Sequence, residues 1–152
     1  METERVKKLF ENLYGGNPWL DITLRGTLSA IPAEKAAIKP LSGGNSIWEI
    51  TNHMISWRET VLQRIQGEAI ATPADNYIRP VTDLSEQAWQ ETLIKLDESQ
   101  KQWAVFLTNF RDGALGDISP ENGHTHYEHI HGIIQHDAYH LGQIVLIAKY
   151  HV

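Results

Sequence analysis

Residues 46–65 read SIWEITNHMISWRETVLQRI and carry the clearest helix signal of the chain. Ser46, with Glu49 three residues later, forms a capping box, the pattern that opens a helix by satisfying its first free N–H groups. Apolar side chains then recur every three or four positions, at Ile47, Ile50, Met54, Trp57, Val61 and Ile65. This spacing predicts a long helix with one apolar face, which ends near Gly67.

Shorter helical patterns precede this segment. Apolar residues at helical spacing predict a helix over residues 4–14, which a Gly-Gly-Asn-Pro tract interrupts. Helix is expected to resume over residues 19–30 and to form a short turn over residues 34–38. Residues 40–45, with one proline and two glycines, are expected to form a loop.

Two long helical patterns follow the central segment. One starts after Asp83, where Glu86 gives a weaker start signal, and its apolar pattern stops at Gly113. The other begins near Thr125 and runs to the C-terminus. Residues 68–80 lie between the central helix and the first of these two helices. They contain two prolines and little periodicity, so we expect a linking loop.

Length and composition agree with one helical domain. The chain has 152 residues, of which 41% are hydrophobic and 21% charged, close to the averages for soluble globular proteins. Strand-type alternation bounded by hairpin turns is absent from the sequence. The sequence therefore predicts an all-α four-helix bundle with a single domain over residues 1–152.

Charge patterning excludes several partners. The formal net charge is −6, and the longest basic run is the pair Lys7-Lys8, so we expect no nucleic-acid partner. The sequence lacks an apolar stretch long enough for a membrane span, and residues 1–4 lack the basic start of a signal peptide. We expect a cytoplasmic protein without a membrane partner.

Cysteine is absent, whereas histidine is abundant. The lack of cysteine removes disulfides, thiolate metal ligands and a cysteine nucleophile, so thiol chemistry would need a borrowed thiol. Of the eight histidines, seven lie between His124 and His151, and His53 is the outlier. His136 and His140 are four residues apart, which places both imidazoles on one helix face about 6 Å apart along the axis.

Two imidazoles at this spacing can share one metal ion, but a third ligand is needed. His129 lies about 16 Å from His140 along the predicted helix, too far for bonds near 2 Å to one ion. The third ligand must come from another helix, where His53 sits at the margin of the apolar stripe. Three imidazoles with an open position are typical of a catalytic site, whereas structural zinc sites are usually closed by four ligands. The other histidines are expected to be surface or helix-start residues without a shared role: His124, His126, His129, His131 and His151.

Two motifs in these helices resemble a known family. The stretch SIWEITNHM at residues 46–54, with Trp57-Arg58 after it, is similar to the second-helix motif of the DinB/YfiT-like family. The stretch GIIQHDAYHLGQI at residues 132–144 is similar to its fourth-helix motif. The tract at residues 17–20, NPWL, and the loop before Ser46 extend the resemblance over most of the chain.

The resemblance implies a four-helix bundle with an up-down-down-up course and one divalent metal ion, zinc or nickel, on His53, His136 and His140. It also implies a homodimer and a small-molecule substrate. Characterised relatives include thiol-dependent enzymes such as bacillithiol transferases and a mycothiol-dependent maleylpyruvate isomerase. A low-molecular-weight thiol is therefore an expected cosubstrate.

Three functions remain open from the sequence. The leading hypothesis is a metalloenzyme in which the ion activates a thiol, as in a thiol S-transferase, or a water, as in a hydrolase. A second reads residues 136–140, HDAYH, as a variant of the metalloprotease helix with Asp137 as general base, although Asp137 could instead orient a ligand imidazole. The third is a non-catalytic dimeric bundle that binds a metal or a small ligand.

Overall fold

The computed structural model describes residues 1–40 and 44–150. Four long helices form a bundle, and the short helices α2 (Leu24–Ser29) and α3 (Ala33–Ala36) follow the first of them. A 3-10 turn, η1 (Asp112–Ala114), lies between the last two. The long helices are α1 (Glu2–Gly15), α4 (Ile47–Ile65), α5 (Glu86–Asn109) and α6 (His126–Tyr150). Over the described residues the structure is all-α, as predicted, with one isolated β-bridge between Ile118 and Thr125.

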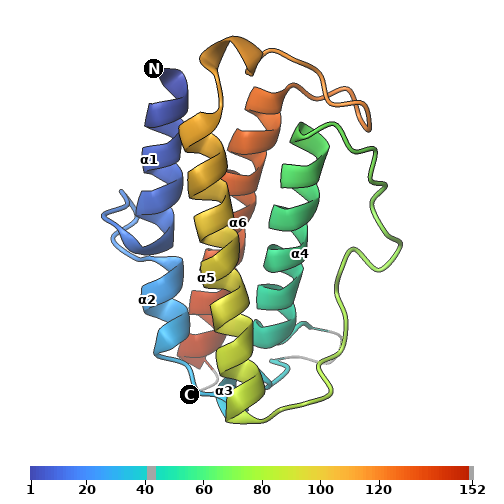
Figure 1. The fold of residues 1–152 in the computed structure, drawn as a ribbon. Coiled ribbons are helices and arrows are strands. Elements are labelled where there is room, and N and C mark those ends of the chain that lie inside the picture. The colour runs from blue at the N-terminus through green and yellow to red at the C-terminus, as the bar shows by residue number, and fades with distance from the viewer. Residues whose placement is uncertain (41–43, 151–152) are drawn as a thin grey trace.

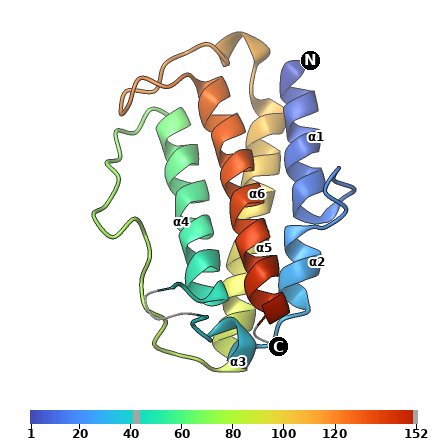
Figure 2. The same ribbon diagram turned by 180° about the vertical axis from the view of Figure 1, so that it is seen from behind.

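The helices follow the predicted up-down-down-up course. In Figures 1 and 2, α4 and α5 run in the same direction, whereas α1 and α6 run opposite to them. Parallel neighbours need a long connection, and residues 66–85 return along the outside of α4 to reach the start of α5 (Figure 1). No helix in the described part of the chain is both long and apolar enough to cross a membrane.

Polar side chains fix the starts of the two helices that carry the candidate ligands. At α4, the Glu49 N–H donates to Ser46 Oγ at 3.1 Å and the Ser46 N–H donates to Glu49 Oε2 at 2.9 Å. The predicted capping box is therefore confirmed. Thr125 and Glu128 make the same reciprocal pair before α6, at 3.2 and 2.7 Å. Both helix registers are thus set at their first turns.

Two helix predictions need correction. The helix expected over residues 19–30 is confined to Leu24–Ser29, because Thr23 caps it by accepting a hydrogen bond from the Gly26 N–H at 3.1 Å. Before this cap, Trp19 is 95% exposed and Asp21 has a positive φ of 58°, so the chain turns there. The predicted loop over residues 40–45 lies partly outside the described residues.

The third long helix is also shorter than expected. Its N-cap is Ser85, which accepts from the Ala88 N–H at 3.2 Å, whereas Asp83 accepts from the Ser85 N–H outside the helix. It ends at Asn109, before the expected stop at Gly113, because Phe110 already has an extended backbone.

Two apolar clusters fill the bundle. One surrounds the indole pair Trp48 and Trp89, whose ring centroids are 5.1 Å apart, and the other surrounds Phe10 and Trp103 at 5.3 Å. All four rings are almost completely buried. Both clusters include residues of α4 and α6, which hold these two helices together where the candidate ligands meet.

Candidate metal centre

The three predicted ligands meet where α4 and α6 pack together. His53 Nε2 lies 3.0 Å from His136 Nε2, which lies 3.1 Å from His140 Nε2. One ring nitrogen from each residue lies within 4.8 Å of the other two. Three nitrogens bound tetrahedrally to one zinc ion would be about 3.3 Å apart. The spacing of the imidazoles thus fits a single ion with little movement.

The contacts of the other ring nitrogens direct the lone pairs inward. His53 Nδ1 is 2.7 Å from the Asn76 carbonyl, which can only accept, so Nδ1 carries the proton and Nε2 is an acceptor. His140 Nδ1 donates in the same way to Gln143 Oε1 at 2.7 Å, and the Gln143 amide donates to the Tyr139 hydroxyl. Acceptors that face one another require a cation between them, which is the chemistry of a metal site.

His136 completes this arrangement through two buried atoms that lack hydrogen-bond partners. They are His136 Nδ1 and Asp137 Oδ1, which lie 3.8 Å apart. A proton on Nδ1 would direct a donor toward the Asp137 carboxylate and leave Nε2 free to bind an ion. The residues therefore fit a divalent metal.

Burial keeps two of these imidazoles neutral. Desolvation by burial, together with the neighbouring His136, lowers the pKa of His140 from 6.5 to about 4. Burial likewise lowers the pKa of His53, although the hydrogen bond to Asn76 partly opposes this shift. The neutral imidazole is the form that binds metal, so at neutral pH both side chains are ready to do so.

The connection over residues 66–85 supplies the partner of His53. Asn76 and Tyr77 both have positive φ angles, 49° and 59°, which non-glycine residues seldom adopt. The Trp57 indole N–H donates to Asn76 Oδ1 at 3.0 Å, and the Tyr77 hydroxyl hydrogen-bonds to Thr60 at 2.7 Å. These contacts with α4 hold the strained backbone and aim the Asn76 carbonyl at His53.

Asp137 is committed to an ion pair inside the bundle. It is fully buried, and its Oδ2 accepts from Arg58 Nε at 2.9 Å and from Arg58 Nη2 at 2.7 Å. Arg58, 1% exposed, also donates to Gln100 and lies over the Phe10 ring at 4.8 Å. The reading of Asp137 as a metalloprotease general base is therefore wrong, because its carboxylate faces the core and cannot reach a substrate.

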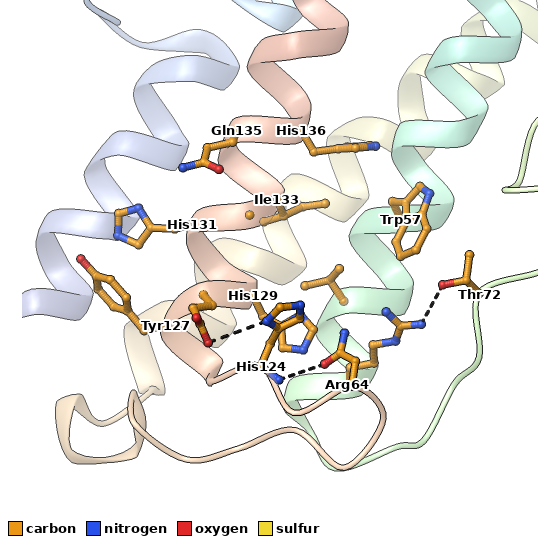
Figure 3. A pocket seen from close by; sticks show the side chains of 14 residues that line it. Trp57, Arg64, Thr72, His124, Tyr127, His129, His131, Ile133, Gln135 and His136 are labelled. Carbon is orange, nitrogen blue, oxygen red and sulfur yellow. Dashed lines mark hydrogen bonds and ion pairs between the residues drawn. The ribbon is translucent and has the colours of Figure 1, made fainter.

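Two cavities adjoin the candidate metal centre, one lined by all three candidate ligands and the other by His136 among them. The smaller, of about 470 Å³, is lined by all three together with Asn45, Asn76 and Tyr139. The larger, of about 780 Å³, extends along α6 toward its first turn. Trp57 and His136 line both cavities, and Figure 3 shows them at one end of the larger one.

The sequence predicted that the remaining histidines are surface or helix-start residues, but the structure buries one of them, His129. His124 is exposed, and His126 contacts the Ala114 carbonyl at the start of α6. His129, in contrast, is only 7% exposed and lines the larger cavity, which His131 also lines. His151 lies outside the described residues. Asn76 carried no sequence signal for its place beside His53, because this contact depends on a backbone carbonyl in a non-periodic loop.

The chain is thus an up-down-down-up helical bundle. Its second and last long helices, α4 and α6, bring three imidazoles together at a candidate metal centre. A family model described as the DinB superfamily matches residues 23–144, and the chain belongs to this family.

The fold also matches the structure of YfiT from Bacillus subtilis, described as "a probable metal-dependent hydrolase with an unusual four-helix bundle topology". The TM-score is 0.63 at 15% sequence identity, and the match covers 97% of this chain and 86% of that one. At this identity the likeness establishes a shared fold. A search of curated proteins found no significant match.

Proposed function

We propose that the protein is a metal-dependent enzyme that holds one divalent ion, zinc or nickel, through His53, His136 and His140 and acts on a small-molecule substrate. The Nε2 atoms of His53 and His140 lie 3.0 and 3.1 Å from His136 Nε2, and this convergence is the observation that carries the proposal. A divalent ion in such a site lowers the pKa of a thiol or a water bound to it and so generates a nucleophile at neutral pH.

The chain's own residues hold this site in a fixed geometry. The Asn76 carbonyl and Gln143 Oε1 orient the rings of His53 and His140 through their Nδ1 atoms. Trp57 and Tyr139 form walls of the smaller cavity, where a substrate would lie against the ligands. Among the described residues that line this cavity there is no Asp or Glu, so the chain offers no carboxylate base there.

Two nucleophiles fit this site. Transfer of a thiol would require a low-molecular-weight cosubstrate, because the chain contains no cysteine. Hydrolysis would require only water, and the description of YfiT as a probable metal-dependent hydrolase supports that reaction. The same three-histidine site serves either reaction.

A non-catalytic metal site that only links α4 to α6 is the competing function. The access to the ligands argues against it. His136 keeps 24% of its side chain exposed, and cavities adjoin it on two sides. A metal that serves only to hold helices together is usually enclosed by four protein ligands, whereas an open coordination position is typical of catalytic sites.

The test combines metal analysis with an activity screen. Untagged protein should contain one divalent ion per chain, and His53→Ala, His136→Ala and His140→Ala should each lower metal affinity by orders of magnitude. His124→Ala, which removes an exposed histidine, is the matched control. Stoichiometric metal in the His53→Ala protein would overturn the ligand assignment. Turnover of ester and electrophile substrates with and without added thiol would then separate hydrolysis from transfer.

A further inference from the structure

We propose that the larger cavity binds a small organic molecule by its carboxylate end, which Arg64 and His129 hold about 10 Å along α6 from the candidate metal centre. This inference rests on the proposed function, since it assigns the distal group of the substrate that reaches the three histidines. It follows from the shape of the cavity, an uncompensated buried cation and an unpaired buried imidazole.

The cavity connects the two ends. Its volume is about 780 Å³, enough for a small organic ligand. Figure 3 shows Trp57 and His136 toward one end and Arg64, His124 and His129 toward the other. Val61 and Ile133 line the space as well, so the body of the ligand would meet apolar surface.

Arg64 is a buried cation without a counter-charge. It is 4% exposed, and its Nε and Nη2 donate to the Ile70 carbonyl and to Thr72 Oγ1, which are both neutral. In the part of the chain that the structure describes, no carboxylate lies within 4.0 Å of its guanidinium. Arg58, which is also buried, is paired with Asp137. Because buried charges are normally paired, the Arg64 guanidinium would favour an anion in the cavity that it lines.

His129 supplies a second, independent indication. It lies in the first turn of α6, is 7% exposed, and its Nε2 is buried without a hydrogen-bond partner. The His124 ring lies beside it at 5.7 Å between centroids. Burial lowers the pKa of His129, and the neighbouring His124 and Arg64 lower it further, so the imidazole is neutral at pH 7. In the tautomer that carries the proton on Nε2, His129 would donate to a bound oxygen acceptor.

Glu128, the one acid among the described residues that line the cavity, does not supply the missing counter-charge. Glu128 Oε2 accepts from both the N–H and the hydroxyl of Thr125, so its carboxylate is committed to the helix cap. Among the described residues that line the cavity, Arg64 is the one Arg or Lys. One permanent positive charge matches a monoanionic carboxylate better than a dianionic phosphate, and the planar guanidinium suits a planar carboxylate. The chemistry therefore favours an acid with an apolar body.

The experiment measures the preference for a carboxylate over a matched alcohol by calorimetry on the full chain. Mercaptooctanoate and mercaptooctanol carry the same thiol for the metal, and their extended chains match the separation of the two ends. Wild-type, zinc-loaded protein should bind the carboxylate about tenfold to a hundredfold more tightly, the effect of one charge-assisted hydrogen-bond group. Mercaptopropionate, which is too short to reach Arg64, should show no such preference over mercaptopropanol.

Variants locate the preference. Arg64→Met and His129→Phe should each reduce the ratio of carboxylate affinity to alcohol affinity to near one, and circular dichroism reports whether each variant is folded. His129→Asn keeps an N–H donor and should retain part of the preference. Arg5→Met removes the same charge from an 82% exposed side chain and should retain all of it. Equal affinities in the wild type, or a preference that persists in Arg64→Met and His129→Phe, would overturn the inference.

Octanoate and octanol on metal-free protein separate this inference from the proposed function. If the three histidines hold no metal, both thiol probes lose their thiol contribution, and the proposed function fails. The octanoate preference and its loss in His129→Phe would still decide whether the carboxylate site exists. If Arg64→Met proves unfolded, the His129 pair of variants gives the answer.

Discussion

Asp137 joins two functions in one carboxylate. Its Oδ2 neutralises the buried Arg58, and its Oδ1 faces Nδ1 of the candidate ligand His136 at 3.8 Å. A charge in the core is costly unless it is paired, so neither Arg58 nor Asp137 can be changed alone without exposing the other to an apolar environment.

Asp137→Asn should therefore lower the free energy of unfolding of the metal-free protein by about 3 kcal/mol, because it leaves the Arg58 charge uncompensated. It should also weaken metal binding about tenfold to a hundredfold, through loss of the negative partner of His136. Urea denaturation and a metal titration measure the two effects. The double variant Arg58→Met, Asp137→Leu removes both charges and should be less destabilised than the single one. A single variant as stable as the wild type would show that the pair contributes little.

The ligand set could be predicted at this scale, but its supports could not. Helical spacing places His136 and His140 on one face. Because His129 is too far from His140 along the same helix, the third ligand had to come from another helix, where His53 is the candidate. The partner of His53 is a backbone carbonyl in a loop, which any residue could provide. Burial of His129 was missed for a related reason, because the cavity it lines includes loop residues outside the periodic pattern.

At the scale of elements, the connection over residues 66–85 does more than join two parallel helices. Asn76 accepts the Trp57 N–H with its side chain and the His53 Nδ1–H with its carbonyl, while its own backbone has a φ of 49°. The strain in this turn is thus tied to the orientation of a candidate metal ligand.

Asn76→Gly and Asn76→Ala separate these contributions, because both remove the side-chain acceptor but only glycine tolerates the positive φ. The glycine variant should be more stable than the alanine variant by about 1 kcal/mol, the usual cost of this backbone region for an L-residue. Thermal unfolding of the two proteins measures the difference. Metal affinity should fall more in Asn76→Ala, where the turn can relax away from His53. Equal stability of the two variants would contradict a role for the strained turn.

Element boundaries were predictable where capping chemistry is explicit in the sequence. Ser46 and Glu49 fixed the start of α4, and Thr125 lies one residue before α6. α2 was overextended because helical spacing continued through a tract whose conformation is set by a local cap at Thr23. Apolar periodicity alone cannot distinguish a helix from a turn that happens to share its spacing.

At the scale of the whole molecule, α6 carries an apolar stripe outside the bundle. Tyr139, Leu146 and Tyr150 are each more than half exposed, and their separations of seven and four residues place them on one helix face. Contiguous exposed apolar surface is typical of an interface, and two-fold dimers are the commonest assembly. The expected homodimer would cover this stripe.

Light scattering should therefore give a mass of about twice the 17.3 kDa of one chain at micromolar concentration. Leu146→Glu places a charge in the stripe and should shift the mass toward that of a monomer. Val105→Glu, at an exposed apolar position on α5, is the control and should leave the mass unchanged. A wild-type mass of one chain at this concentration would rule out the dimer.

Metal retention should fall with pH while the bundle stays folded. Each ligand must be deprotonated to bind, so protons compete with the ion. Burial lowers the pKa of His140 to about 4 and also lowers that of His53, so protons are weaker competitors here than at an exposed histidine. The midpoint of metal loss should therefore lie below 6.5, the pKa of an exposed histidine. With three ligands to protonate, the loss should be steeper than a one-proton curve.

Dialysis from about pH 8 to about pH 4, with metal analysis and circular dichroism in parallel, measures both quantities. The unfolded chain binds protons more readily than the folded one at His140, so the stability of the metal-free protein declines as pH falls from 6.5 toward 4. The two apolar clusters of the bundle do not titrate, and helicity should outlast the metal across this window. Metal and helicity lost together would instead indicate that the ion holds α4 and α6 in place. Full occupancy at pH 4 would contradict a site made of three imidazoles, since protons would then have displaced none of its ligands.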